Sequence, residues 1–331
     1  MKNLAWLWIL VVAACAPKEQ KTVSTDVEIL DAEAEQFFDQ ETTVETLCSG
    51  FEWSEGPLYI EDGDFLLFSD VPANKIYKYD GDTATYLTPS GFTGEVYHGR
   101  ERGSNGLLLN HEQKLVLLQH GDRRVAQMLA PINQPKPLFL TLVDSYEGLK
   151  FNSPNDGAYA ANGDLYFTDP PYGLDGLLED STKELSFQGI YVLRVDGTLS
   201  LIDSTVTYPN GIALASDQSY LIVSSSDLLN KTWYKYTLNQ DGTVASKTTF
   251  HEAKEDNGLE NGCPDGLKIN KAGYVFASGP EGLWVFNPAG KVIAKVKMHS
   301  LTSNVAFGPN EQEIYLTCDD TVKRIKLKSP L

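Results

Sequence analysis

The stretch NDGAYAANGDLYFTDPPYG, residues 155–173, contains a pattern that the rest of the chain repeats. Asn155 precedes a small-residue step and an apolar run, and the turn Asn162-Gly163-Asp164 leads into a second apolar run. Asn-Gly and Asp-Gly turns between short apolar runs are typical of β-hairpins. This stretch therefore predicts the first hairpin of a small antiparallel sheet.

An oxygen-bearing side chain precedes such a run six times in the chain. The six are Glu55 in EGPLY, Asn105 in NGLLL, Asn155 in NDGAY, Asn210 in NGIAL, Asp265 in DGLKI and Asn304 in NVAF. Their spacing is 50, 50, 55, 55 and 39 residues. Repeats of this length with several short strands each indicate a β-propeller. A large sandwich or barrel would not explain six similar steps, so we predict an all-β, six-bladed propeller over residues 43–331, with residues 43–49 closing the ring beside the last blade.

The propeller topology predicts where the six side chains lie. The first strand of each blade lines the central channel, so the six positions meet at one mouth. The second strands run back to the same face, and we expect their ends to form the rim: Asp70, His120 to Asp122, Asp169 to Tyr172, Ser226-Asp227 and Gly279 to Glu281. A ring of carboxylate and amide oxygens suits Ca²⁺, or Mg²⁺ and Mn²⁺ with retained waters, while Zn²⁺ could use only the carboxylates. Alternatively, each Asn or Asp starts its strand through local turn hydrogen bonds.

Six short motifs resemble the gluconolactonase/senescence-marker-protein-30 family. They are EGP at 55–57, SPND at 153–156, FTDPPYG at 167–173, YPNG at 208–211, CPDG at 263–266 and SNVAFG at 303–308. They follow the family order and cover the chain from about residue 50 to 330. HGDRRV at 120–125 and GPEGLWVFNPAGK at 279–291 resemble the larger bacterial branch.

The resemblance implies one divalent metal at the channel mouth. The family's metal ligands fall on Glu55, Asn155, Asn210 and Asp265, and its proposed catalytic base falls again on Asp265. Asp156 and Asp169 are the other carboxylates that could accept a proton. The family's animal branch has an arginine at the position of Ser153, so recognition of the sugar must differ here. We expect substrate contacts from Asn105, His120, Arg123, Tyr172 and Asn304.

The family's members hydrolyse sugar lactones, and some act on other lactones or esters. We therefore expect a metal-dependent lactonase, in which the cation polarises the carbonyl and Asp265 deprotonates water. The absence of a GxSxG elbow argues against a serine hydrolase. Two alternatives stay open: a non-catalytic propeller that binds a sugar or a protein, and an esterase or phosphotriesterase that uses the same metal.

The N-terminus indicates export. After Met1-Lys2-Asn3 comes an apolar run of 11 residues, shorter than the roughly 20 that span a bilayer. It ends in Val-Ala-Ala-Cys, which resembles a bacterial lipobox, so we expect residues 1–14 to be a signal peptide and Cys15 to carry lipid. The polar residues 15–42 are expected to form a flexible tether, in which Phe37 and Phe38 could either dock onto the domain or lie exposed on the surface. The protein would then be a membrane-anchored lipoprotein facing the periplasm or the cell surface.

Charge and cysteine content limit the partners. The net charge of -18 argues against binding to nucleic acid, whose phosphates would be repelled. Cys48, Cys263 and Cys318 remain once Cys15 is set aside, and without a CxxC element a zinc site is not expected. Cys48 and Cys318 could pair if the ends of the domain meet, or all three could be free thiols.

Overall fold

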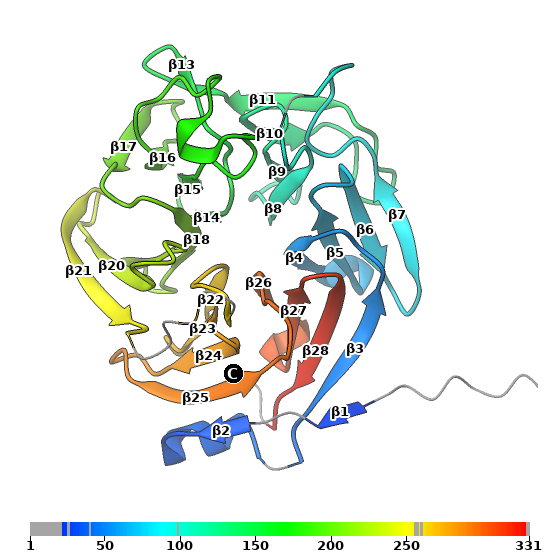
Figure 1. Cartoon of the computed structure of the whole chain (residues 1–331), viewed down its shortest axis with the longest axis vertical. Helices are drawn as coiled ribbons and strands as arrows, with labels where there is room; N and C mark the ends of the chain where they lie inside the picture. Colours follow the sequence, from blue (N-terminus) through cyan, green and yellow to red (C-terminus); the bar gives the residue numbers. More distant parts are fainter. Residues whose placement is uncertain are drawn as a thin grey trace, which may run out of the picture.

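The protein is an all-β, six-bladed propeller, as the repeat predicts. The computed structural model describes residues 22–24, 27–39, 41–97, 99–254, 258 and 261–328. Within them, six antiparallel sheets stand around one axis (Figure 1). The first strand of each sheet lies innermost, and the order of strands in the sheet follows the chain outward. All inner strands therefore start at the same end of the channel.

The strands of the six blades have the following bounds. Blade 1 contains β4 (Ser54–Ile60), β5 (Phe65–Asp70), β6 (Lys75–Tyr79) and β7 (Thr83–Leu87). Blade 2 contains β8 (Ser104–Leu109), β9 (Leu115–Gln119), β10 (Arg124–Met128) and β11 (Phe139–Val143). Blade 3 contains β14 (Gly157–Tyr159), β15 (Leu165–Asp169), β16 (Gly189–Leu193) and β17 (Leu199–Asp203), and the small hairpin β12 (Ser145–Tyr146) and β13 (Leu149–Lys150) precedes it. Blade 4 contains β18 (Pro209–Leu214), β19 (Tyr220–Ser225), β20 (Thr232–Leu238) and β21 (Val244–Glu252).

The last two blades each have a fifth strand from the N-terminal region. Blade 5 contains β22 (Leu267–Ile269), β23 (Val275–Gly279), β24 (Gly282–Phe286) and β25 (Val292–Lys297), and β2 (Val27–Ile29) pairs with β25. Blade 6 contains β26 (Asn304–Phe307), β27 (Glu313–Cys318), β28 (Thr321–Lys326) and β3 (Thr43–Ser49), and β1 (Thr22–Ser24) pairs with β3. Four short 3₁₀ turns are η1 (Ala32–Gln36), η2 (Glu61–Gly63), η3 (Leu177–Glu179) and η5 (Pro309–Glu311).

The glycine of the repeated step has a steric cause. A Cβ on Gly56 would lie 2.1 Å from the Asn105 carbonyl oxygen, and one on Gly211 would lie 2.3 Å from the Asp265 carbonyl oxygen. Both carbonyls belong to the start of the next blade, so a side chain here would push neighbouring inner strands apart. The glycine in four of the six steps thus allows neighbouring inner strands to approach closely.

The ring closes where the sequence predicts. Strand β3 pairs antiparallel with β28, with Val322 opposite Cys48 and Ile325 opposite Val44. An early strand thereby completes the last blade, and the two ends of the domain are joined by a full ladder of backbone hydrogen bonds. Cys48, Cys263 and Cys318 are free thiols in this arrangement.

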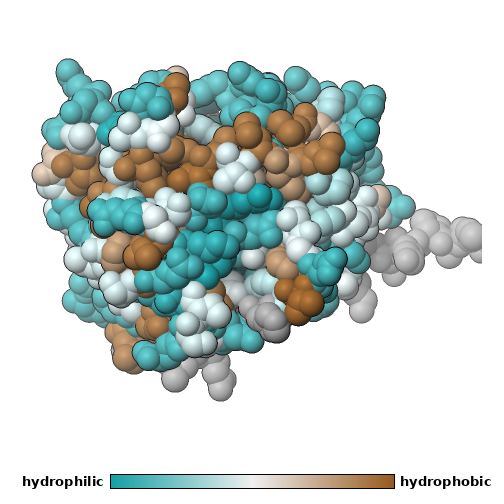
Figure 2. Space-filling view, turned by 90° about the horizontal axis from the view of Figure 1, so that it is seen from above, coloured by the Kyte–Doolittle hydropathy of each residue, from teal (hydrophilic) through white to brown (hydrophobic). Residues whose placement is uncertain are grey.

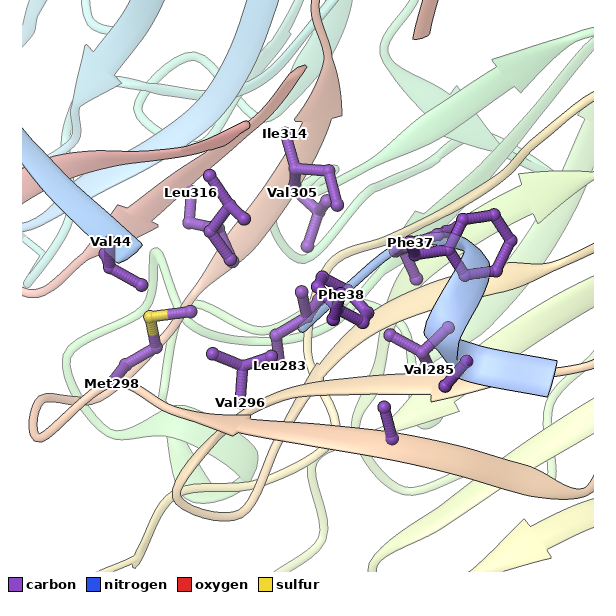
Figure 3. Close-up of a cluster of buried hydrophobic side chains, with 14 of the residues drawn as sticks. Phe37, Phe38, Val44, Leu283, Val285, Val296, Met298, Val305, Ile314 and Leu316 are labelled. Atoms are coloured by element: carbon purple, nitrogen blue, oxygen red, sulfur yellow. The ribbon is translucent and has the colours of Figure 1, made fainter. Parts of the chain in front are cut away.

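Residues 27–39 differ from the flexible tether expected over residues 15–42. Phe37 and Phe38 are almost fully buried in a cluster between blades 5 and 6, beside Leu283 and Val305 (Figure 3). The Phe37 ring lies edge-on to Phe276 at 5.7 Å. We call residues 27–39 the N-terminal strap. The acidic composition suggested a solvated chain, but these two aromatic rings gain enough from burial to order it.

Figure 2 shows a mixed surface, with hydrophilic residues running between separate hydrophobic patches. Over the described part of the chain, no helix has the length and apolar character needed to cross a membrane. The predicted signal peptide and Cys15 lie outside the described residues.

Candidate active site at the mouth of the channel

The six repeated positions meet at one end of the channel. Glu55, Asn105, Asn210 and Asn304 lie in inner strands, and Asn155 and Asp265 lie two residues before theirs. Neighbouring inner strands contact one another around the axis. Asp265 is partly exposed, whereas the other five side chains are buried. The sequence pattern is therefore a ring in space, which we call the mouth ring.

Among the described residues, three oxygens of the mouth ring are buried and have no hydrogen-bond partner. They are Oδ1 of Asn105, Oδ1 of Asn155 and Oδ1 of Asp265. A buried acceptor without a partner costs about 1–3 kcal/mol, so unpartnered oxygens that share one site point to a ligand. The Asn210 amide donates to Ser226 Oγ at 2.9 Å, which fixes its orientation.

The charges of the mouth ring also fit a cation. Burial raises the pKa of Glu55 to about 8, and the nearby Glu101 and Asp156 carboxylates add to the shift. Burial, followed by the charge of Glu55, raises the pKa of Asp265 well above its ordinary value. A divalent cation would offset this repulsion. No group of three or more His, Cys, Asp or Glu among the described residues is arranged for a metal ion, so a cation at the mouth ring would also need the asparagine amide oxygens.

Asn304 has a different role from the other ring members. Its Oδ1 accepts a hydrogen bond from the Val305 amide at 2.8 Å, and its Nδ2 donates to Glu55 Oε2 at 3.4 Å. The side chain therefore presents its donor, not its acceptor, to Glu55. This arrangement orients the Glu55 carboxylate, and the predicted substrate contact of Asn304 stays a prediction.

Tyr172 flanks the mouth ring. Its ring stacks on Tyr208 with centroids 5.8 Å apart and planes 21° from parallel. Burial, followed by the charge of Asp265, raises the pKa of Tyr172 well above its ordinary value. The phenol therefore keeps its proton next to Asp265, where it can donate a hydrogen bond to a substrate.

Arg123 is turned toward the loops beside blade 3. Its Nε donates to the Phe151 carbonyl at 2.5 Å and its Nη1 donates to the Thr182 carbonyl at 3.0 Å. These bonds give Arg123 a bracing role in the protein, and a contact with substrate stays a prediction. His120 lies fully buried next to Glu101, with Nδ1 3.0 Å from Glu101 Oε2.

The two other candidate carboxylates have structural partners. Asp169 accepts the backbone N–H groups of Asn152 and Ser153, both at 2.8 Å, and burial raises its pKa to about 7. Asp156 occupies the position that is glycine in four other blades, accepts the Gly157 N–H at 2.8 Å, and lies 3.7 Å from Lys268 Nζ. Neither has the partly exposed position of Asp265, so Asp265 remains the best candidate for the base.

Hydroxyl side chains on the second strands were not singled out from the sequence. Thr168 donates to the Asn210 carbonyl at 2.7 Å, and Ser224 donates to the Asp265 carbonyl at 2.6 Å. Ser69 donates to the Asn105 carbonyl at 2.9 Å. Each bond crosses from one blade to the ring residue of the next. A Ser or Thr near the end of each second strand except β9 is a signal that could have identified them.

Glu101 is another residue that the sequence analysis missed. It lies in the long connection between β7 and β8, outside any repeat. Its Oε2 lies 3.0 Å from Nδ1 of His120, which follows β9, and its charge contributes to the raised pKa of Glu55 and of Asp265. No local pattern in the sequence marks this residue.

Fold and site together define a six-bladed propeller with carboxylate and amide oxygens gathered at one mouth. The SMP-30/Gluconolactonase/LRE-like region matches residues 53–319. The chain is 37% identical over 300 residues to a gluconolactonase of Zymomonas mobilis, covering 88% of this chain and 83% of the relative. It is 23% identical over 281 residues to a pentonolactonase of Haloferax volcanii, covering 83% of each.

A solved gluconolactonase structure is also similar to this chain. The gluconolactonase of Xanthomonas campestris superposes with a TM-score of 0.77 at 25% identity, covering 93% of this chain and 97% of that one. The chain belongs to the SMP-30/gluconolactonase family, as the motifs indicated.

Proposed function

We propose that this protein is a divalent-cation-dependent hydrolase that opens a sugar lactone, with Asp265 as the general base. The observation that carries the proposal is the set of unpartnered buried oxygens of Asn105, Asn155 and Asp265 in a ring that also holds Glu55. Carboxylate and amide oxygens are the ligands of hard cations.

Lactone hydrolysis itself rests on the family. The relatives above are named gluconolactonase and pentonolactonase, and they align over most of this chain. The chain is a lactonase on this basis. The sugar character of its substrate, the cation and the roles of single residues are the proposal.

Glu55, Asn155, Asn210 and Asp265 would hold the cation. When bound, it would polarise the lactone carbonyl and stabilise negative charge on the carbonyl oxygen. Calcium is the first choice because amide oxygens supply half of this ligand set, and Mg²⁺, Mn²⁺ and Zn²⁺ are the alternatives to test.

The chain's own residues supply the remaining chemistry. Asp265 accepts a proton from a water molecule as the water oxygen bonds to the carbonyl carbon. The bond between that carbon and the ring oxygen then breaks, the proton passes to the departing alkoxide, and the product is a hydroxy acid. The Tyr172–Tyr208 stack forms an aromatic wall beside Asp265, against which a sugar ring can pack.

We also propose that the protein is exported and anchored by lipid on Cys15. The apolar run and the Val-Ala-Ala-Cys sequence support this. Labelling cells with a radioactive fatty acid should mark the wild-type protein and not Cys15→Ser. A labelled Cys15→Ser protein would contradict the anchor site.

Hydrolysis of glucono-1,5-lactone by protein treated with EDTA, before and after addition of each cation, tests the function. We expect activity to disappear with EDTA and to return with Ca²⁺ or another divalent cation. Lack of turnover of any lactone or ester with every cation would favour the non-catalytic propeller, and turnover of an aryl phosphotriester alone would favour the phosphotriesterase.

Asp265→Asn tests the base. It should lower kcat by about 10²–10⁴-fold, since it removes the proton acceptor. Asp217→Asn is a matched control, because Asp217 is an exposed aspartate in the turn between β18 and β19, where its Oδ1 accepts the Ser219 N–H at 3.0 Å. Normal turnover by a folded Asp265→Asn protein would exclude this role.

A further inference from the structure

The connection between β7 and β8 is a built part of the mouth. We call residues 88–103, described apart from residue 98, the mouth loop. Asn74 Oδ1 accepts the backbone N–H groups of Ser90, Gly91 and Phe92 at 2.7–3.1 Å. Thr93 donates its hydroxyl to Asp122 Oδ2 at 2.7 Å. These bonds fasten the first half of the loop to blades 1 and 2.

The second half of the mouth loop is fastened to blades 1 and 3. The Tyr97 hydroxyl lies 2.7 Å from the Glu101 carbonyl oxygen and 2.8 Å from the Gly173 carbonyl oxygen. The Gly103 amide donates to the Val71 carbonyl at 2.7 Å. Glu101 is therefore held between two fixed points, and its backbone position is set by the surrounding blades.

The Glu101 side chain extends from the loop toward the mouth ring. Its Oε2 lies 3.0 Å from Nδ1 of His120, and the side chain is 24% exposed. Its charge acts on Glu55, Asp265 and Tyr172, the residues that surround the proposed reaction centre. The carboxylate is thus partly open to solvent beside the buried His120.

His120 is the second observation that points to a ligand. Its side chain is fully buried, yet neither ring nitrogen has a hydrogen-bond partner among the described residues. The distance from Nδ1 to Glu101 is short enough for a hydrogen bond, but the two groups are not aligned for one. Both groups can therefore still form a hydrogen bond with a ligand. A hydroxyl group can donate to the carboxylate and accept from the imidazole at the same time.

We propose that Glu101 and His120 bind a hydroxyl group on the lactone ring, which makes Glu101 a residue that selects hydroxylated lactones over unsubstituted ones. This inference rests on the proposed function and adds the feature of the substrate that the site recognises. A lactone without that hydroxyl would bury Glu101 and His120 without giving either a hydrogen-bond partner. The cost of these unpaired polar groups would weaken its binding.

The kinetic test compares two six-membered lactones, glucono-1,5-lactone and δ-valerolactone, which has no hydroxyl groups. Glu101→Ala should lower kcat/KM for gluconolactone by about 10- to 100-fold, mainly through KM, because a hydrogen bond to a charged group is lost. The kcat/KM for δ-valerolactone should change less than about twofold. Glu95→Ala, which removes an exposed acid from the same loop, should change neither value.

A binding test keeps the inference independent of turnover. Gluconolactam and δ-valerolactam have the same ring shapes, and calorimetry on the full chain can measure their binding. Glu101→Ala should weaken binding of gluconolactam and leave δ-valerolactam unchanged. Failure of the wild type to hydrolyse either lactone would overturn the proposed function, whereas equal binding of gluconolactam by wild type and Glu101→Ala would overturn this inference.

Two further outcomes would also contradict the role of Glu101. An equal loss of activity on both lactones would mean that Glu101 acts on the reaction or on the fold. A loss of bound calcium from Glu101→Ala, measured by elemental analysis, would make Glu101 a ligand of the cation. We expect the calcium content to be unchanged, because the ring oxygens remain in place.

Discussion

Glu55 and Asp265 are two mouth-ring carboxylates whose pKa values are raised in the folded protein, Glu55 being buried and Asp265 partly exposed. Burial is the main cause for both, and the charge of Glu55 also acts on Asp265. A cation held by Glu55 and Asp265 would offset the cost of ionising both groups. The free energy of unfolding should therefore depend on pH and on metal binding through these two carboxylates.

The first prediction concerns pH. The pKa of Glu55 is raised from 4.5 to about 8 in the folded protein, so between these values the folded state holds a proton that the unfolded state has lost. Stability of the cation-free protein should therefore fall as the pH rises from about 5 to 8, by about one to a few kcal/mol. Urea denaturation in EDTA across this range measures it.

Calcium should reduce this loss, because it binds the ionised form and competes with the proton. Glu55→Gln should flatten the pH dependence in EDTA, since the side chain can no longer ionise. A pH dependence of the same size in Glu55→Gln would assign the effect to other groups.

Glu55→Gln also tests the metal site directly. The variant should lose calcium affinity by tenfold or more, because a charged ligand becomes neutral and each factor of ten corresponds to about 1.4 kcal/mol. Elemental analysis of dialysed protein, with Glu52→Gln as the control for a nearby surface acid, measures the difference. Unchanged calcium content in Glu55→Gln would contradict its role as a ligand.

A site residue can be predicted from the sequence when a local sequence pattern marks it. The repeat marked all six ring positions, and the family resemblance selected Glu55, Asn155, Asn210 and Asp265 among them as the expected metal ligands. Glu101 was not found because the mouth loop has no periodicity, and its approach to His120 exists only in the folded protein. The structural role of Asp169 was also hidden, since it depends on backbone N–H groups that precede it by 16 and 17 residues.

At the scale of elements, the second strands support the mouth ring through their hydroxyls. Ser224 in β19 donates to the Asp265 carbonyl at 2.6 Å, and Thr168 in β15 donates to the Asn210 carbonyl at 2.7 Å. Because the ring residues come from different blades, these bonds hold neighbouring ring residues in place relative to one another. The strands themselves were predictable from alternation and turns, but the bonds between blades were not.

Ser224→Ala should therefore affect both stability and activity. It leaves a buried carbonyl with one fewer donor, so we expect a loss of about 1–3 kcal/mol in the free energy of unfolding. Activity on gluconolactone should also fall, since Asp265 loses a support of its backbone. Ser216→Ala is the matched control, because Ser216 lies in an exposed turn of the same blade, where its Oγ donates to the Lys271 carbonyl at 3.1 Å. Equal effects of the two substitutions on activity would contradict a role for Ser224 at the mouth.

At the scale of the whole molecule, the N-terminal region joins the two blades that close the ring. Strand β3 completes blade 6, β2 extends blade 5, and Phe38 fills the space between them (Figure 3). The closure by β3 was predictable because the repeats left the last blade short of a strand. The N-terminal strap was not predictable, because its composition is polar and the sequence left open whether its two aromatic side chains dock onto the domain or lie exposed.

The last prediction separates closure of the ring from catalysis. Phe38 is fully buried, so Phe38→Ala should lower the free energy of unfolding by about 3–5 kcal/mol. The strap packs against Tyr274, at the start of β23, whereas the mouth lies near the end of that strand, so kcat per folded molecule should be unchanged. Urea denaturation and gluconolactone hydrolysis measure the two quantities. Val195→Ala, on a side chain that is 69% exposed, should leave both unchanged. If Phe38→Ala lowered kcat in fully folded protein, packing of the strap between blades 5 and 6 would affect the mouth, and ring closure and catalysis would not be independent.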